Sequence, residues 1–398
     1  MDLGKSLHWY GPEHAILMGC QAGFEKEVFS EFSQKEHPRC GPEVGFTKFK
    51  ENQGYVVWQG HQFPSKDKAL DLYSPHALTW VPGFARWVLK APFRVVDLDQ
   101  KDRLTQLWER VECLLKELRQ GENPLSDQSY FSLLSQRFLV LHADTNEGRT
   151  IAPVARTLER LMNGRVEMLK KDLKPEFILP SPWTVGVFLD SFHTAYVGLL
   201  VASRSEPWMG GIPKLKTPPG APSRSSLKLE EALCRLAYHR TGEPKMAKVV
   251  ARGETAVDLG ASPGGWTFQL VRHGVYVTAI DNGPMDPQLL ESGLVRHLRE
   301  DAFKYMAPQP VDWLVCDVVE QPHRIVERVN QWVESEKCRA CVVNFKLPMK
   351  KKWEAVQSVL ERLQRPHWPS RPGSALRPFH IFWKHLYFDR DEITVILW

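Results

Sequence analysis

The sequence contains no long apolar run. Of its 398 residues 43% are hydrophobic and 25% are charged, and charged side chains interrupt the apolar stretches before any reaches the roughly 18 residues of a membrane span. The first residues, Met-Asp-Leu-Gly-Lys, lack the apolar core of a signal peptide. These absences argue against a membrane protein and against a secreted one, and we expect a cytoplasmic protein.

Regularly spaced cysteines are missing too. The sequence has seven cysteines, an odd number, which argues against a disulfide framework. Cys338 and Cys341 form a close pair, but no second pair or histidine cluster accompanies them at zinc-ligand spacing. We interpret Cys341 as a small apolar residue of a buried strand, and we expect no metal site.

The sequence also has little net charge. A formal charge of +5 is too small for the whole surface to attract nucleic acid, so any such contact must use local clusters of basic residues. The length of 398 residues predicts two or three domains, because single cores stop growing well below that size. Nothing in the sequence suggests an extended apolar interface, and we expect a monomer.

The N-terminal half has the patterns of a mixed α+β structure. Alternating or continuous apolar runs predict short strands, and helical spacing of apolar residues predicts helices between them. A helix that Asp99 can cap is expected to begin a new subdomain. The predicted strands cover residues 14–20, 54–58, 137–142, 183–190 and 195–202, and the predicted helices cover 24–32, 99–118 and 151–162.

A stretch rich in proline and glycine follows. Residues 203–220 carry four prolines and three glycines, which can continue neither a helix nor a central strand, so we predict a linker over 203–224. Five basic residues face one acidic residue between Ser203 and Lys228. A solvated linker explains this charge, and so does contact with a substrate.

After the linker, strands and helices alternate. Such alternation predicts an α/β domain with a mostly parallel sheet covered on both faces, with a final pair of strands added at its edge. Ligands gather at the carboxyl ends of the strands in such sheets. The predicted strands cover residues 255–259, 275–280, 313–316, 341–345, 381–387 and 393–398, with helices from about 227 and at 266–272, 325–333 and 353–363.

One turn in this domain predicts a nucleoside cofactor. Val257-Asp-Leu-Gly-Ala-Ser-Pro-Gly-Gly-Trp266 reads as a strand, a glycine turn and the start of a helix, and the next strand ends at Asp281. Asp281 could accept hydrogen bonds from ribose hydroxyls. The pattern G-x-x-x-G-G differs from the G-x-G-x-x-G of dinucleotide sites, which favours S-adenosylmethionine. An ordinary strand-to-helix turn is the alternative.

Polar residues follow the other strands at the same sheet edge. Asp301 comes about twenty residues after Asp281 and could meet an adenine amino group, or could cap a helix. Asp317 ends the next strand, and Lys346 ends the strand after that. This edge is where a site is expected.

Lys346 is the candidate general base. A free lysine has a pKa of about 10.4, so the side chain must be made easier to deprotonate. Desolvation and a second ammonium group favour the neutral form, and Lys228 is the candidate for that second group. Asp317 and Glu392 are carboxylates that could orient the two lysines. The alternative for Lys346 is a lysine that simply extends to water.

The same residues help to choose the methyl acceptor. Enzymes that methylate exocyclic amino groups commonly carry an acidic or amide residue, two prolines and an aromatic residue after this strand, whereas this chain has Asp317-Val-Val-Glu. A pyrimidine carbon acceptor needs a cysteine nucleophile, and Cys316 lies inside a predicted strand. Both acceptors are disfavoured. Lys350, Lys351 and Lys352 fit either a solvated helix start or a phosphate contact.

A set of motifs resembles one known family. The glycine turn, Asp281-Asn-Gly-Pro-Met, Val-Cys-Asp317 and Phe-Lys346-Leu-Pro-Met-Lys-Lys are similar to those of the 23S rRNA cytidine 2'-O-ribose methyltransferase M family, which belongs with the FtsJ-like ribose methyltransferases. The likeness continues upstream through Gly23-Phe-Glu-Lys-Glu, Ala143-Asp-Thr-Asn-Glu and Met209-Gly-Gly-Ile-Pro-Lys-Leu-Lys. It therefore covers most of the chain.

The resemblance implies a fold and a reaction. It implies a ferredoxin-like domain over 1–98, a THUMP RNA-binding domain over 99–202, and a Rossmann-like methyltransferase domain over 225–398. It also implies methylation of a cytidine ribose in the peptidyl transferase region of 23S rRNA, free or in a large-subunit precursor. An rRNA-binding assembly factor with a vestigial cofactor pocket, and methylation of a base or of another RNA, are the alternatives.

Residue roles follow from the same resemblance. The family's catalytic tetrad corresponds to Lys228, Asp317, Lys346 and Glu392, with Lys346 as proton acceptor. The residues implied in binding S-adenosylmethionine are Ser225, Ser262, Pro263, Gly264, Gly265, Asp281, Asp301 and Asp317.

Overall fold

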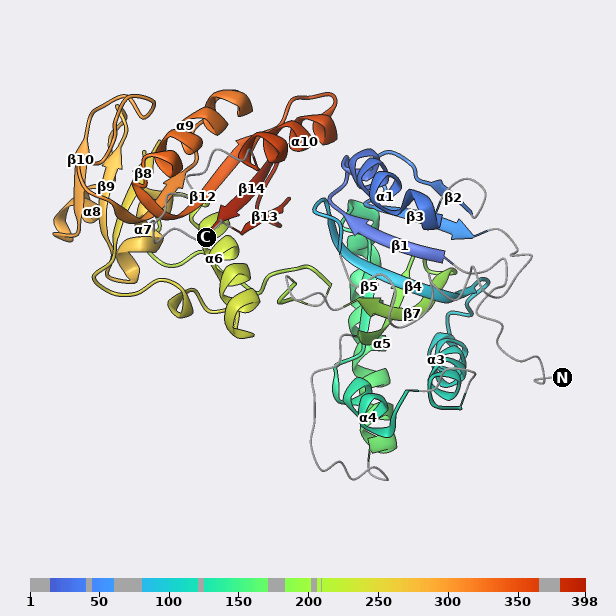
Figure 1. Ribbon diagram of the computed structural model, residues 1–398. Coiled ribbons are helices and arrows are strands. Elements are labelled where there is room, and N and C mark those ends of the chain that lie inside the picture. Colours follow the sequence, from blue (N-terminus) through green and yellow to red (C-terminus); the bar gives the residue numbers. More distant parts are fainter. Residues whose placement is uncertain are drawn as a thin grey trace, which may run out of the picture. The chain divides into compact units, whose positions relative to one another are not determined.

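The computed structural model describes residues 15–40, 45–60, 81–120, 125–170, 183–201, 206–208, 210–364 and 380–398. Predicted residues outside these ranges, such as His14, lie beyond what is described. The chain divides into two compact units, Met1–Ile212 and Pro213–Trp398, and their boundary falls inside the predicted linker 203–224 (Figure 1). None of the helices in the described ranges has the length and apolar character that crossing a bilayer requires.

The first unit is built on one seven-stranded sheet. Its strands lie in the order β2-β3-β1-β4-β7-β6-β5, and all neighbours are antiparallel except β5 and β6. The strands are β1 (Ala15–Cys20), β2 (Gly45–Lys48), β3 (Tyr55–Gly60), β4 (Ala85–Val95), β5 (Leu139–His142), β6 (Trp183–Leu189) and β7 (Ala195–Val201). The helices are α1 (Glu25–Cys40), α3 (Arg103–Gln120), α4 (Asp127–Ser135) and α5 (Asn146–Lys170).

Strand β4 joins the two predicted N-terminal segments. It pairs with β1, from the first segment, and with β7, from the second, so both segments contribute to one sheet. The strand carries buried basic residues that an isolated strand would not bury. Arg86 forms an ion pair with Asp144, and the ammonium group of Lys90 lies 4.6 Å from the ring centre of Trp183. The domain boundaries at 98 and 202 remain predictions.

The second unit is the predicted α/β domain. Its strands lie in the order β10-β9-β8-β11-β12-β14-β13; the first five are parallel, and β14 and β13 are antiparallel to their neighbours. The mostly parallel sheet and the added edge pair are thus confirmed. The strands are β8 (Thr255–Leu259), β9 (Tyr276–Ile280), β10 (Val295–Leu298), β11 (Val311–Cys316), β12 (Cys338–Lys346), β13 (Ile381–Lys384) and β14 (Glu392–Leu397).

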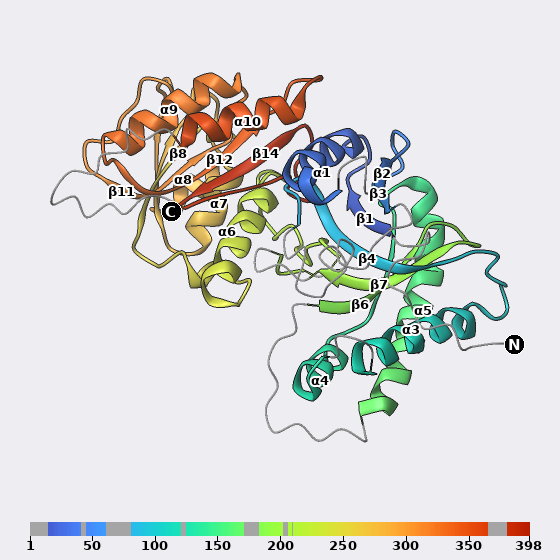
Figure 2. The ribbon, with the colours of Figure 1, turned by 45° about the vertical axis from the view of Figure 1, so that its right-hand side comes forward.

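Helices cover both faces of this sheet. Figure 2 shows α9 and α10 on one face and α6 and α7 on the other. The central strands are mostly buried, as a covered parallel sheet requires, whereas the edge strands β10 and β13 are only partly buried. The helices are α6 (Ser226–Thr241), α7 (Gly265–Arg272), α8 (Pro287–Glu291), α9 (Pro322–Glu334) and α10 (Lys352–Leu363), with a short 3-10 helix, η1 (Met246–Lys248).

The order of the strands determines where a ligand can bind. The connections run outward from β8 to β9 and β10 on one side, and from β11 to β12 on the other. The switch point therefore lies between the carboxyl ends of β8 and β11, the place where α/β sheets bind nucleotides. Gly260, Asp281, Asp317 and Lys346 all come at or directly after the ends of β8, β9, β11 and β12.

Candidate active site

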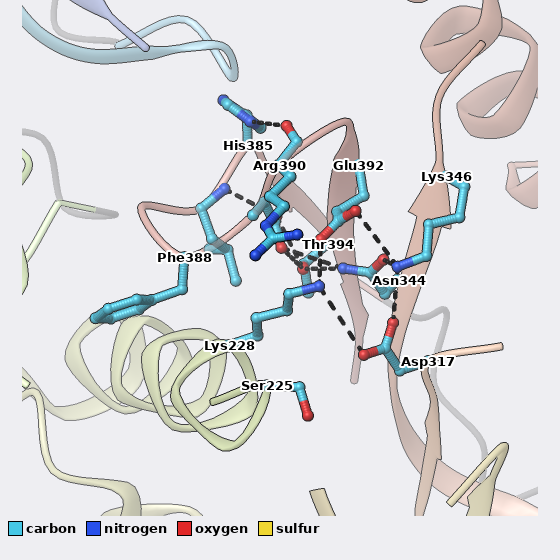
Figure 3. A network of polar contacts seen from close by, with 12 residues as sticks. Ser225, Lys228, Asp317, Asn344, Lys346, His385, Phe388, Arg390, Glu392 and Thr394 are labelled. Carbon is cyan, nitrogen blue, oxygen red and sulfur yellow. Dashed lines mark hydrogen bonds and ion pairs between the residues drawn. The ribbon is translucent and has the colours of Figure 1, made fainter. Parts of the chain in front are cut away.

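Strand pairing places Lys346 next to Glu392. In the antiparallel pair of β12 and β14, Lys346 lies opposite Glu392, and Asn344 lies opposite Thr394. Residues two apart on a strand point to the same face, so Lys346 and Asn344 share one face of β12. Asp317 follows the parallel neighbour β11 and completes the cluster (Figure 3).

The structure brings together all four residues of the predicted tetrad. The Nζ of Lys346 lies 3.1 Å from Oδ1 of Asp317 and 3.4 Å from Oε2 of Glu392. Lys228 forms an ion pair with Oε1 of the same glutamate and lies 3.9 Å from Oδ2 of Asp317. Each carboxylate therefore faces both ammonium groups, and the four charges balance.

Balanced charges affect how Lys346 titrates. Burial alone would lower the pKa of Lys346, but the carboxylates of Asp317 and Glu392 outweigh burial, so this pKa lies above its ordinary value. Burial would likewise raise the pKa of Glu392, yet Lys228 and Lys346 lower it. In this cluster Lys346 is an ammonium group at neutral pH. The sequence suggested that desolvation and the second ammonium group would favour the neutral form of Lys346. In the structure the two carboxylates outweigh these effects.

Helix α6 is fixed to the loop that leads into β14. Glu231, which is fully buried, accepts hydrogen bonds from the backbone N–H groups of Tyr387 (3.1 Å) and Phe388 (3.3 Å). Its Oε1 also pairs with Arg235 at 2.8 Å. Lys228 lies one turn before Glu231 on the same helix face, so these bonds hold Lys228 at a set distance from Glu392.

A buried polar network supports Lys346 from behind. Its ammonium donates to Oδ1 of Asn344 at 3.0 Å, and Nδ2 of Asn344 donates to Oδ1 of Asp389 at 3.1 Å. Thr394 lies 3.2 Å from Oδ2 of Asp389, which also accepts from the backbone N–H of Leu386. Burial raises the pKa of Asp389 well above its usual range. Sequence reasoning missed Asn344, although an amide two residues before Lys346 in an apolar strand was a usable signal.

The glycine turn leaves no room for side chains. Gly264 has φ +116° and forms the N-cap of α7, and a Cβ there would overlap Leu289. At Gly260, with φ +78°, a Cβ would lie 2.7 Å from Val318. A Cβ at Gly265 would overlap the hydroxyl of Ser225. The turn therefore presents bare backbone at the switch point, and it places Ser225 beside Gly265.

Asp281 holds this turn in place. Its two carboxylate oxygens accept hydrogen bonds from the backbone N–H groups of Ser262 (3.0 Å) and Gly283 (2.7 Å). The hydroxyl of Ser262 donates to the carbonyl of Pro284 at 2.8 Å, and the Ser262–Pro263 peptide bond is cis. A carboxylate has about four acceptor positions, so Asp281 retains capacity for ribose hydroxyls.

Asp301 is set apart from these contacts. It is exposed, and its carboxylate accepts a hydrogen bond from the backbone N–H of Phe303 at 2.8 Å. This hydrogen bond caps a turn; the alternative considered for this residue, a helix N-cap, is wrong, because no helix of the described range 210–364 begins at Asp301. Its assignment to an adenine amino group remains a prediction.

Asp258 is a buried carboxyl group that sequence reasoning passed over. It lies in β8 beneath the glycine turn and is 1% exposed, and Oδ2 accepts from the hydroxyl of Thr267 at 2.6 Å. Burial raises the pKa of Asp258 to about 7, against the hydrogen bonds from Thr267 that lower it. The signal in the sequence was a lone acid inside an otherwise apolar strand.

The pKa of Asp258 predicts a pH-dependent stability. Because this pKa is higher in the folded than in the unfolded chain, its contribution to stability is fully present below pH about 4 and is lost as pH rises to about 7. Asp258→Asn removes this titration. We expect the difference in free energy of unfolding, variant minus wild type, to rise by about 3 kcal/mol between pH 5 and pH 8. Denaturant titrations of both proteins at both pH values measure this difference. Parallel pH profiles of wild type and variant would contradict the prediction.

Comparison with known proteins gives consistent matches. The family model of FtsJ-like methyltransferases matches residues 221–355. The ribosomal RNA large subunit methyltransferase M of Xanthomonas oryzae pv. oryzae (strain PXO99A) is 36% identical over 385 residues, which cover 96% of this chain and 98% of the relative. The protein of the same name from Shewanella loihica is 34% identical and covers 96% of each chain. The likeness therefore includes both compact units.

Proposed function

This chain belongs to the ribosomal RNA large subunit methyltransferase M family, and from that premise we propose that it transfers a methyl group from S-adenosylmethionine to a ribose 2'-hydroxyl of 23S rRNA. The proposed acceptor is a cytidine of the peptidyl transferase region, in free RNA or in a large-subunit precursor. The proposed general base is Lys346, within the tetrad that it forms with Lys228, Asp317 and Glu392.

The observation that carries this proposal is the position of Lys346. Lys346 is half-buried at the end of β12, close to the switch point. Its amine lies between the carboxylates of Asp317 and Glu392. A hydroxyl acceptor requires a group that removes its proton as the methyl group arrives. In this cluster, Lys346 is the more exposed of the two amines, with 25% of its side chain accessible against 12% for Lys228.

The residues around the turn fit the cofactor. The backbone of the turn at Gly260, Gly264 and Gly265 carries no side chains, and the carboxylate of Asp281 has acceptor capacity beyond its two backbone hydrogen bonds. When bound, S-adenosylmethionine supplies a methyl group carried on a positively charged sulfur. The residues that we propose to hold it are Ser225, Ser262, Pro263, Gly264, Gly265, Asp281, Asp301 and Asp317.

The tetrad then has two tasks. Asp317 and Glu392 keep the amine of Lys346 in a fixed orientation, and Lys228 pairs with both carboxylates, which lowers the entropic cost of positioning the acceptor oxygen. Lys346 must give up its own proton before it accepts one from the ribose hydroxyl. An additional positive charge beside the cluster would lower the pKa of Lys346 and so increase the fraction of neutral amine. A rise in pH also increases this neutral fraction.

The N-terminal unit is proposed to hold the RNA. This extends the prediction of a ferredoxin-like segment at 1–98 and a THUMP domain at 99–202. Arg149, Arg156 and Arg160 on α5 are exposed and follow one another at spacings of seven and four residues, which places them on one helix face. Clustered basic side chains of this kind suit the phosphate backbone.

A direct test is to locate the methyl group. Unmodified 23S rRNA, or a precursor particle from cells lacking the enzyme, is incubated with the protein and S-adenosylmethionine, digested, and mapped by mass spectrometry. We expect one added methyl group on a cytidine ribose. A methylated base or a different RNA contradicts the proposed acceptor. Calorimetric titration without detectable S-adenosylmethionine binding favours the alternative, an assembly factor with a vestigial pocket.

A further inference from the structure

A separate pocket adjoins Lys346. It has a volume of about 740 Å3 and lies between the loop after β11, the first turns of α9, and one face of α10. None of its lining residues belongs to the glycine turn or to the Asp281 loop. Lys346 lines this pocket, which lies between the segments that follow β11 and β12, whereas the predicted cofactor cradle lies at the end of β8.

The walls of the pocket suit a flat, partly apolar ring. Pro322 and Pro348 line it, as do Val326 and Val359, while Ser358 and Arg362 supply polar groups. Of its other charged residues, Glu320 already pairs with Arg324. The volume falls within the roughly 300 to 1,000 Å3 that is usual for small-molecule pockets. A pocket of this size can hold a nucleoside. A lining in which apolar side chains predominate suits a base better than a bare phosphate.

Two exposed apolar side chains occur on the loops beside it. Val319, in the lining, is 83% exposed, and Met349, which directly follows Pro348, is 98% exposed. Each comes two or three residues after a catalytic position, Asp317 or Lys346. Exposed Lys350 and Lys351 follow Met349 and could contact phosphates. Apolar side chains bordered by lysines are suited to an unstacked base that is still attached to its backbone.

Geometry limits what can occupy the pocket. The acceptor oxygen must come within about 3 Å of the amine of Lys346. The base of the same nucleotide is attached to the adjacent ribose carbon, so it must lie within one ring's width of that amine. This pocket is a lined space that Lys346 borders, whereas the glycine turn is assigned to the cofactor.

We propose that this pocket receives the base of the nucleotide whose ribose is methylated, turned out of the RNA stack. The proposal rests on the proposed function and adds to it a specificity site, formed by the loop after β11 and by α10. Enzymes that act on a nucleotide within structured RNA or DNA commonly extrude it into such a pocket.

Filling the pocket provides the test. Ser358 is exposed and lines the pocket on α10, so Ser358→Trp places a large ring in it. Gln364, also exposed, follows α10 and is not among the lining residues, and Gln364→Trp is the matched control. We expect Ser358→Trp to bind S-adenosylmethionine as wild type does and to lose at least about thirtyfold in kcat/KM for RNA, while the control stays within twofold. Equal thermal midpoints show that both variants fold.

An abasic substrate identifies the occupant. In a ligated RNA that lacks only the acceptor base, Ser358→Trp no longer obstructs anything, and we expect it to methylate this RNA at the wild-type rate for the same substrate. Relief by an abasic site at a neighbouring nucleotide instead, or wild-type activity of Ser358→Trp on intact RNA, overturns the proposal. If wild-type protein methylates no ribose at all, the proposed function itself fails, which is a different outcome.

Discussion

Lys346→Ala is expected to bind S-adenosylmethionine with unchanged affinity and to transfer its methyl group to unmodified 23S rRNA about a thousandfold more slowly than wild type. Positioned general bases contribute roughly 10² to 10⁴ in rate, and Lys346 also interacts with both carboxylates of the cluster. Calorimetry measures the binding, and single-turnover assays with radiolabelled cofactor measure the transfer. Unchanged turnover contradicts the assigned role.

Lys346→Arg separates the loss of a base from the loss of a charge. Arginine keeps the positive charge between Asp317 and Glu392, but it cannot be deprotonated in a protein. If Lys346 serves only to balance the carboxylates, the arginine variant recovers most of the activity. If it accepts the proton, the arginine variant stays nearly as slow as the alanine variant.

The pH profile gives a second discriminating measurement. Because the pKa of Lys346 lies above its ordinary value in this cluster, its neutral fraction grows with pH throughout the alkaline range. Single-turnover rates of wild type should therefore rise with pH over that range. The residual rate of Lys346→Ala should lack this dependence, and an equal rise in both proteins would assign the titration to another group.

The C-terminal fold could be predicted because its local patterns agree with its tertiary structure. The predicted strand at 255–259 coincides with β8, and the predicted helix at 266–272 differs from α7 by one residue. Parallel strands buried on both faces read as short continuous apolar runs, and the glycine turn marks the passage to a helix. Topology then brings the strand ends to one edge, which is how Asp317 and Lys346 could be associated before any distance was known.

The N-terminal sheet was harder to predict because tertiary contacts override its local pattern. No strand was assigned to residues 85–95, where β4 carries Arg86, Lys90 and Pro92. These residues suit an exposed segment, but Arg86 pairs with Asp144 from a distant part of the chain. Lys90 faces the ring of Trp183. A single sequence does not show such partners.

The electrostatic balance of the site was not predictable from residue types alone. Two lysines at one sheet edge suggested mutual repulsion and an easily deprotonated base. The register of β12 and β14 instead places a glutamate directly opposite Lys346, and Asp317 reaches the same amine. Whether a lysine is neutral or charged depends on separations of a few ångströms, and these follow only from the pairing of the strands.

Gly264→Ala is expected to weaken the binding of S-adenosylmethionine at least tenfold, or about 1.4 kcal/mol, while the protein stays folded. The residue has φ +116°, which alanine rarely adopts, and its new Cβ would overlap Leu289 and lie 3.2 Å from Met285. Leu289 and Met285 belong to a buried cluster with Ala261 and Ala279 and have little room to move. The turn must therefore shift away from the switch point, and calorimetric titration measures the consequence.

Gly293→Ala is the control, because it also places an alanine at a positive φ but causes no steric overlap. Gly293 has φ +70°, and a Cβ there would meet nothing within 4 Å. We expect this variant to lose about 1 kcal/mol of stability and to bind the cofactor as wild type does. If both variants bind normally, the turn tolerates displacement and does not form the cofactor contact. If both bind weakly, backbone strain anywhere in the unit affects the site, and the steric argument for Gly264 fails.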